Sequence, residues 1–294
     1  MDKNDFNKIL EMRRISKGFP GVQALDQVSF DLYEGEVHVL LGENGAGKST
    51  LIKILSGAYR LDSGEILLRG NKVDINEPRK GINLGLSCIY QEYNLNPFTT
   101  VYENIFSGRE IRNRFGFIDI KRTITETEKI LKRMGLNVSP KTLIRNLGVA
   151  QKQLVEIAKV ISMDAKIIIF DEPTSALAQD EINNLFQIIR DLKTHGYAII
   201  YISHRLEEIV ELGDRFTVLR DGRSIGTGNV KEMELGEVIK MMVGREVLHD
   251  AAAELGVRPD DVGEKLEERP GLFGGPPLIT RLYVAAVQTA LAEH

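Results

Sequence analysis

The chain has 294 residues, 43% of them hydrophobic and 27% charged, which is enough to bury the core of one large domain or two smaller ones. A formal net charge of -4 argues against broad, unspecific nucleic-acid binding, and we expect no nucleic-acid partner. The single cysteine, Cys88, excludes an internal disulfide, and no stretch reaches the about 18 apolar residues of a membrane span, so a soluble, cytoplasmic protein is expected.

Strand patterns alternate with helix patterns along the chain. The predicted strands are 36–41, 85–90, 166–170, 197–202 and 215–220, and several are nearly continuous apolar runs, as in a sheet covered on both faces. The predicted helices include 48–57, 151–159 and 181–192, each with an apolar face at the helical period. This alternation predicts an α/β fold with a mostly parallel sheet.

Three further regions differ from this alternating core. The stretches "VSFDL" and "GEILLRG" predict an additional antiparallel β layer near the N-terminus. Residues from about 94 to 163 lack strand patterns and are interpreted as a mostly helical insertion, a helical subdomain within a first domain of residues 1–248. The composition changes after about residue 248, so residues 249–294 are predicted to form a separate, helical C-terminal tail of unknown role, or a fusion scar.

A glycine-rich motif joins the first predicted strand to the first helix. "LLGENGAGKST" contains the pattern G-x-x-x-x-G-K-S from Gly42 to Ser49. Its glycines let backbone N–H groups surround phosphate oxygens at the start of a helix, whose dipole favours anions. Lys48 is expected to reach the β- and γ-phosphates, and the Ser49 hydroxyl to ligate Mg²⁺. The predicted nucleotide-binding residues of this loop are Gly42, Glu43, Asn44, Gly45, Ala46, Gly47, Lys48, Ser49 and Thr50.

Two acidic residues follow the apolar strand "IIIF". A carboxylate at the end of a strand beside a phosphate loop can hold Mg²⁺, and Asp171 is predicted to do so. The adjacent Glu172 is predicted to be the catalytic base that accepts a proton from the attacking water. An Asp-Glu pair after a strand is often only a solvated turn, so this interpretation depends on the nearby phosphate loop.

Two polar residues follow other strands. Gln91 comes after 85–90, where its amide could contact the nucleotide, orient water and ligate Mg²⁺. His204 follows 197–202 and is a candidate catalytic contact to the γ-phosphate. Each signal is weak alone, because a lone histidine at this place is more often a cap or a surface group.

These motifs, in this order, resemble the ATP-binding cassette (ABC) ATPases from about residue 9 to residue 246. The likeness is greatest to the sugar-importer branch, and within it to the N-terminal cassette of proteins with two cassettes in one chain. The resemblance implies a P-loop NTPase core that binds ATP and Mg²⁺. It also implies that Phe19 stacks on adenine, although an ordinary phenylalanine at the end of a strand is the alternative.

The helix predicted at 151–159 begins without the usual Ser, Thr, Asp or Asn cap. In the family that the chain resembles, the residues at the start of this helix form a signature motif. The N-terminus of the helix faces the γ-phosphate of ATP bound to a second cassette, so that two cassettes close head-to-tail. The corresponding residues are Leu147, Gly148, Val149, Ala150 and Gln151. Gly148 replaces the family's usual serine, which predicts a weakened composite site. Ala178 stands where the family often has Asp or another polar residue, which predicts altered communication across the dimer.

The resemblance implies an ATP-hydrolysing subunit that powers a membrane permease for the import of a sugar. It would be cytoplasmic and peripheral on the inner face of the membrane, with a second ATP-binding cassette as partner and a solute-binding protein as an indirect one. Two alternatives are a non-transport ABC ATPase and an ATP-binding switch module with weak hydrolysis. A two-cassette sugar-importer ATPase needs about twice this length, so the chain is expected to be a half, a fragment or a fusion.

Overall fold

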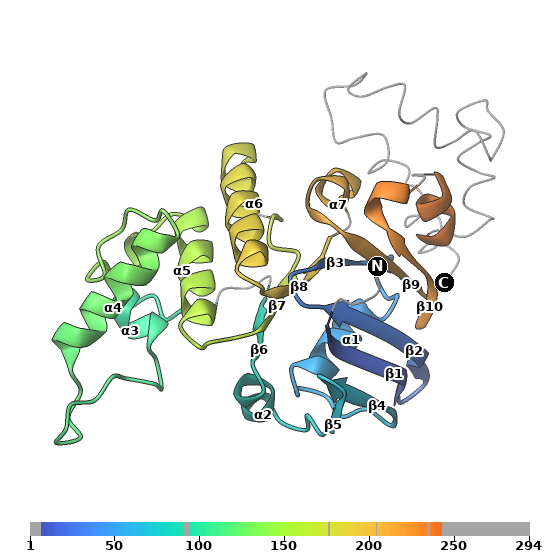
Figure 1. Cartoon of the computed structure of the whole chain (residues 1–294), viewed down its shortest axis with the longest axis horizontal. Coiled ribbons are helices and arrows are strands. Elements are labelled where there is room, and N and C mark those ends of the chain that lie inside the picture. Colours follow the sequence, from blue (N-terminus) through green and yellow to red (C-terminus); the bar gives the residue numbers. More distant parts are fainter. Residues whose placement is uncertain (1–6, 91–93, 176, 204, 234–235, 243–294) are drawn as a thin grey trace.

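The computed structural model describes residues 7–90, 94–175, 177–203, 205–233 and 236–242 (Figure 1). The predictions for Gln91, His204 and the tail lie outside these residues. Among the helices that are described, none combines the length and the apolar character that crossing a bilayer requires.

A six-stranded sheet forms the centre of the molecule in the order β10-β9-β3-β8-β7-β6. All five predicted strands are present and run parallel to one another. They are β3 (Val37–Leu41), β6 (Leu86–Ile89), β7 (Ile167–Asp171), β8 (Ala198–Ile202) and β9 (Arg215–Arg220). The sixth strand, β10 (Arg223–Asn229), pairs antiparallel to β9 and was not predicted, because its sequence "RSIGTGN" is polar and mostly exposed.

A second, four-stranded antiparallel sheet confirms the predicted additional layer. Its order is β2-β1-β4-β5, with β1 (Lys8–Phe19), β2 (Val22–Tyr33), β4 (Ser63–Leu68) and β5 (Asn71–Val73). Only parts of this sheet were predicted. Its two longest strands contain register shifts, and Arg14 and Gln27 have φ of 47° and 52°, so the regular alternation of apolar residues is interrupted.

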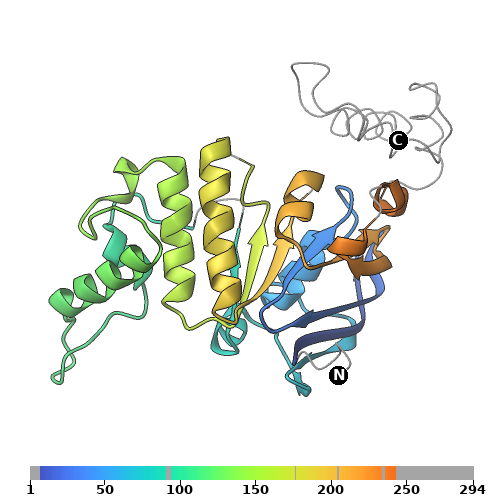
Figure 2. The same ribbon diagram turned by 45° about the horizontal axis from the view of Figure 1, so that its top comes forward.

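Helices cover both sides of the central sheet (Figures 1 and 2). Between the two sheets lies α1 (Lys48–Leu55), and α2 (Pro78–Asn83) precedes β6. The other face carries α3 (Val101–Ile105), α4 (Ile120–Arg133), α5 (Val149–Ile161), α6 (Gln179–Thr194) and α7 (Leu206–Leu212), and two short 3₁₀ turns lie at Ile144–Asn146 and Val230–Glu232. The described residues between 94 and 163 contain helices and two isolated β-bridges, so the predicted helical insertion is confirmed, while its bounds and the boundary at 248 remain predictions.

The central strands divide their side chains between two apolar cores. In β7, Ile168 and Phe170 pack against the helices, whereas Ile167 and Ile169 face α1 and the antiparallel sheet. Because successive side chains of a strand point to opposite faces, a strand covered on both sides must be apolar throughout. Full burial of each such side chain contributes about 1.5–3 kcal/mol.

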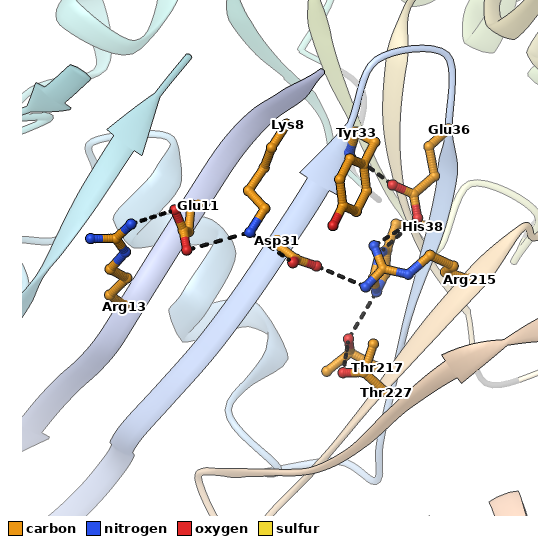
Figure 3. Close-up of polar contacts among 10 residues, drawn as sticks. All are labelled: Lys8, Glu11, Arg13, Asp31, Tyr33, Glu36, His38, Arg215, Thr217 and Thr227. Carbon is orange, nitrogen blue, oxygen red and sulfur yellow. Dashed lines mark hydrogen bonds and ion pairs between the residues drawn. The ribbon is translucent and has the colours of Figure 1, made fainter. Parts of the chain in front are cut away.

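A polar cluster joins the two sheets at the edge away from the helical insertion (Figure 3). Arg215 of β9 donates to Asp31 of β2 at 2.9 Å and to Glu36 at 3.3 Å. The fully buried His38 contacts Glu36 through Nδ1 at 3.1 Å and Thr217 through Nε2 at 2.8 Å. Charged and polar groups are costly to bury unless they are paired, so these contacts fix how the antiparallel layer sits on the central sheet.

The Asp31 carboxylate should stabilise the fold in a pH-dependent way. Burial raises the pKa of Asp31, but Arg215 and Lys8 outweigh burial, and the pKa lies below its usual value. A carboxyl with a lowered pKa in the folded state adds stability above its unfolded pKa, and this contribution disappears as the pH falls through the folded pKa. Asp31→Asn should therefore lower the free energy of unfolding by about 1–3 kcal/mol at pH 7.

Urea denaturation at pH 7 and at about pH 3 measures this effect. The difference between Asp31→Asn and wild type should shrink at the lower pH, because the carboxyl of the unfolded chain is then protonated and folding must release that proton. As a matched control, Asp164→Asn changes a side chain that is 87% exposed and should cost less than about 0.5 kcal/mol. An equal loss for Asp31→Asn at both pH values would contradict the assigned ion pairs.

Candidate functional site

The glycine-rich loop runs from the end of β3 to the start of α1. Gly42 has φ of 146° and Gly45 has φ of 85°, both in the region that favours glycine. The two positions differ in their surroundings. A Cβ at Gly42 would collide with the carbonyl oxygen of Leu219 on β9, whereas a Cβ at Gly45 would meet no atom within 4 Å. The loop is therefore held tightly against the sheet at its beginning and is open at its middle.

The N-terminus of α1 offers backbone groups and a cation. Its N-cap is Gly47, which provides no side-chain cap, so the N–H groups of the first turn are available to an external acceptor. The Lys48 side chain is 7% exposed, and its ammonium donates to the carbonyl oxygens of Gly42 at 2.7 Å and Glu43 at 2.9 Å. Burial lowers the pKa of Lys48, although nearby carboxylates oppose the effect. The arrangement suits an anionic ligand, which would satisfy both the ammonium and the amides.

Two carboxylates stand at the carboxyl end of β7. Asp171 is its last residue, and burial followed by the proximity of Glu172 raises the pKa of Asp171. Glu172 has φ of 48°, and its backbone N–H donates to the carbonyl oxygen of Ile202 at 3.1 Å. A non-glycine residue in the left-handed region costs about 1–3 kcal/mol, and such strain gathers at functional sites.

A cavity of about 490 Å³ brings these groups together. Its volume lies in the range of small-molecule sites. Its lining residues are Val22, Gln23, Ala24, Glu43, Asn44, Gly45, Gly47, Lys48, Ser49, Thr50, Asp171, Glu172, Asp221 and Gly222. Most of the predicted loop residues and both predicted carboxylates therefore share one cavity. Gly42 and Ala46 do not line it, but they support the loop through hydrogen bonds to Lys48 and Gly222.

Two segments of the lining were not predicted. Val22–Ala24 begin β2 and carry no motif, so only the packing of the two sheets brings them to the loop. Asp221 and Gly222 form the turn between β9 and β10, and Gly222 accepts a hydrogen bond from the Asp26 backbone at 2.7 Å. An Asp-Gly pair after a strand is a turn signal that could have identified this second segment. Burial, followed by the proximity of Asp221, raises the pKa of Glu43.

Phe19 lies outside the cavity lining. It ends β1, where it pairs with Val22, and its side chain is 38% exposed. Its ring packs edge-on against Tyr59, with the ring centroids 5.3 Å apart. An adenine-stacking role for Phe19 stays a prediction.

The signature stretch begins α5 and also lies outside this cavity. Leu147 is buried, and Gly148 is the exposed N-cap. In the described part of the chain, no side chain caps the first-turn N–H groups of α5, whereas the Gln151 Oε1 accepts a hydrogen bond from the Gly148 N–H at 3.1 Å. A Cβ at Gly148 would meet only this Oε1, at 3.9 Å, so a serine would fit there. Contact of residues 147–151 with a second cassette stays a prediction.

The segment after Gln91 is attached to α5. The Asn94 N–H donates to Glu156 Oε1 at 2.5 Å, and Lys159 donates to the Asn94 carbonyl oxygen at 3.2 Å. Burial raises the pKa of Glu156. Beside these contacts α2, β6 and α5 border a groove of about 340 Å³. One helix therefore connects the signature stretch to the chain that follows Gln91.

The fold and the cavity together define a P-loop nucleotide-binding protein with a helical insertion. Residues 25–175 match the ABC transporter family, and this chain belongs to that family. The resemblance drawn from the motifs is thereby confirmed.

Relatives of known name and structure agree with this assignment. The chain is 50% identical to the ribose import ATP-binding protein RbsA 2 of Streptomyces coelicolor, over 92% of this chain and 52% of that protein. It is 46% identical to the ribose import ATP-binding protein RbsA of Hahella chejuensis, over 86% of this chain and 51% of that protein. A crystal structure of the ADP conformation of MJ1267, an ATP-binding cassette of an ABC transporter, has a TM-score of 0.71 at 26% identity and covers 81% of this chain and 99% of that chain. The chain thus spans about half the length of the curated relatives it matches.

The two loop glycines provide a matched test of this geometry. Gly42→Ala should destabilise the fold by about 3 kcal/mol or more, because the new methyl group meets backbone that cannot move freely. Gly45→Ala has open space around it and should lose only about 1–2 kcal/mol from its backbone conformation. Thermal unfolding without nucleotide measures both. An equal loss of stability in the two variants would show that the close approach of the Leu219 carbonyl oxygen to Gly42 does not determine the cost of the substitution.

Proposed function

We propose that this chain is an ATP-binding and ATP-hydrolysing cassette that powers a membrane permease. The observation that carries the proposal is the single cavity in which the uncapped start of α1 and Lys48 meet Asp171 and Glu172. Relatives named as ribose import ATP-binding proteins support a sugar as the cargo. The transporter as a whole requires more than this chain, which corresponds to about half of those relatives.

The cavity provides a distinct place for each part of the substrate. The loop from Gly42 to Thr50 would hold the phosphates of ATP through its backbone N–H groups, and Lys48 would contact the β- and γ-phosphates. Ser49 and Asp171, with Gln91, would hold Mg²⁺, which supplies positive charge to the phosphate oxygens. Ser49 and Asp171 line the same cavity, which fits this assignment.

Hydrolysis requires a group that accepts the proton of the attacking water. Glu172 lines the cavity beside Asp171, and a carboxylate there can act as this general base. His204 would contact the γ-phosphate from the loop after β8.

Closure of two cassettes would couple this chemistry to transport. In our proposal Leu147–Gln151 meets the γ-phosphate of ATP held by a second cassette, as the amides at a helix start can. The bonds of Asn94 to Glu156 and Lys159 would then pass the movement to the groove beside α2, where the permease docks. The subunit would be cytoplasmic and peripheral on the inner face of the membrane, with a solute-binding protein as an indirect partner.

Replacing the proposed base tests the hydrolytic role. Glu172→Gln should reduce ATP turnover at least about a hundredfold while leaving ATP affinity within about twofold, because the amide cannot accept the proton. Phosphate release and equilibrium binding of ATP measure the two quantities. Turnover equal to that of the wild type would remove Glu172 from the mechanism.

The contrasting variant Lys48→Ala should weaken ATP binding itself, because the lost ammonium contacts the phosphates directly. Lys53→Ala is a suitable control, since Lys53 is an exposed residue of the same helix and does not line the cavity. Unchanged affinity in Lys48→Ala would count against the phosphate-loop assignment.

Restoring the missing hydroxyl tests the signature stretch. Because glycine is itself a tolerated N-cap, Gly148→Ser should raise stability by no more than about 0.5 kcal/mol, with or without ATP. If the stretch faces ATP on a second cassette, the serine should also strengthen ATP-dependent dimerisation, by up to about ten- to a hundredfold for a hydrogen bond to a charged group. Light scattering measures this dimerisation in the Glu172→Gln background, where hydrolysis does not remove the ATP. A gain that is the same with and without ATP would reduce the stretch to an ordinary helix start.

A further inference from the structure

A hairpin between α3 and α4 exposes two aromatic rings. We call residues 112–118 of this hairpin the aromatic tip. Phe115 is 69% exposed and Phe117 is 71% exposed, and the neighbouring Ile118 is 51% exposed. Contiguous exposed apolar side chains of this size are a common mark of an interaction surface.

The backbone of the aromatic tip is well fixed. The Asn113 N–H donates to the Phe117 carbonyl oxygen at 2.8 Å, and the Asn113 side chain accepts from the N–H groups of Phe115 and Phe117 at 2.9 and 3.1 Å. Arg112 donates to the Gly116 carbonyl oxygen at 2.9 Å. These bonds hold the turn in one conformation while both rings remain in solvent.

The hairpin is also attached to the helical insertion at its base. Arg109 donates to the carbonyl oxygen of Ser162, at the end of α5, at 2.8 Å. The Asp119 N–H donates to the Ile111 carbonyl oxygen at 2.7 Å, and its side chain caps α4 by accepting from the Arg122 N–H at 2.9 Å. A force that displaces the aromatic tip would therefore be transmitted to both α4 and α5.

Positive charge surrounds the tip. The exposed cations are Arg112 and Arg114 on the tip and Lys121 and Arg122 in the first turn of α4. The Arg114 guanidinium lies 4.6 Å from the centroid of the Phe115 ring. The two nearby carboxylates already accept backbone hydrogen bonds, Glu110 from Gly108 and Asp119 from Arg122. This local excess of cations contrasts with the net charge of -4 for the whole chain.

The position of the tip relates it to the groove beside α2. In both views the green hairpin between α3 and α4 projects to the same lower side of the molecule as α2 (Figures 1 and 2). The groove bordered by α2 is where our proposed function places the permease. The tip then points toward the membrane that the permease spans.

We propose that the aromatic tip inserts into the headgroup region of a bilayer that contains anionic lipids. Aromatic rings surrounded by Arg and Lys match an anionic bilayer surface, since the rings enter the interface and the cations pair with lipid phosphates. A narrow, convex turn offers far less than the about 1,200 Å² that a stable protein interface buries, so lipid is the better match. The proposal deepens the proposed function, because it rests on the cassette working beside a membrane.

The absence of tryptophan from the sequence allows a direct test. Phe115→Trp introduces a single fluorophore at the tip, and Phe98→Trp is the matched control, because Phe98 is 75% exposed and lies outside the tip. With vesicles of phosphatidylcholine and phosphatidylglycerol, the emission of the Phe115→Trp variant should shift to the blue and be quenched by brominated lipid. Vesicles of phosphatidylcholine alone should give neither effect. An unshifted emission, or an equal shift in both variants, would overturn the proposal.

Vesicle binding by otherwise unaltered protein gives a second measurement. The double variant Phe115→Ala, Phe117→Ala should bind anionic vesicles about tenfold or more weakly, as measured by flotation of the protein with the vesicles. The double variant Arg114→Gln, Lys121→Gln should lose about fivefold in vesicle affinity for each cation removed. Phe98→Ala should bind as the wild type does. The lipid proposal would be overturned if these variants bound vesicles as well as the wild type does. It would also be overturned if binding appeared only when a permease was added, since the tip would then contact a protein.

The outcome is separable from that of the proposed function. The Phe115→Ala, Phe117→Ala variant should keep its ATP turnover in the absence of vesicles, whereas Glu172→Gln should lose turnover and still bind anionic vesicles. Full turnover in Glu172→Gln alone would leave the lipid contact standing and remove the catalytic assignment. Failure of vesicle binding alone would remove the lipid contact and leave the catalytic assignment of Glu172 standing.

Discussion

The placement of α1 between two sheets is the constraint on which the rest of the molecule depends. Its apolar side chains face the central sheet on one side and the antiparallel sheet on the other, so the helix has little freedom to shift. A buried helix whose first turn lacks a side-chain cap must present its N–H groups to something at that end. The glycine-rich loop supplies a cavity there, and the carboxylates of β7 stand across it. The packing of the fold thus places uncapped N–H groups and the Lys48 ammonium in one cavity, an arrangement that suits an anion.

The same packing explains what could be predicted from the sequence. The five parallel strands are apolar on both faces, and their patterns are therefore continuous and easy to find. The phosphate loop and the Asp171–Glu172 pair are local motifs, so their residues could be named without knowing the fold. By contrast, β10 is polar and exposed, and β1 and β2 are interrupted where Arg14 and Gln27 adopt positive φ.

Tertiary structure also brings to the site residues that no motif had assigned to it. Val22–Ala24 reach the cavity only because the antiparallel sheet packs over α1, and Asp221 reaches it through a turn that β9 positions. The hydrogen bond from the Gly148 N–H to the Gln151 side chain was also not predicted, because a cap was sought only at the start of the helix. The role proposed for residues 147–151 involves a second cassette, so contacts within this chain do not test it.

The two bonds of the Lys48 ammonium to the carbonyl oxygens of Gly42 and Glu43 have a consequence for nucleotide exchange. They give the loop internal partners, so it can keep its shape when no phosphate is present. Arrival of a nucleotide then exchanges one set of partners for another and does not require the loop to become ordered, which keeps the entropic cost of binding low. Once a ligand has left, the loop would already have the shape that the next one needs.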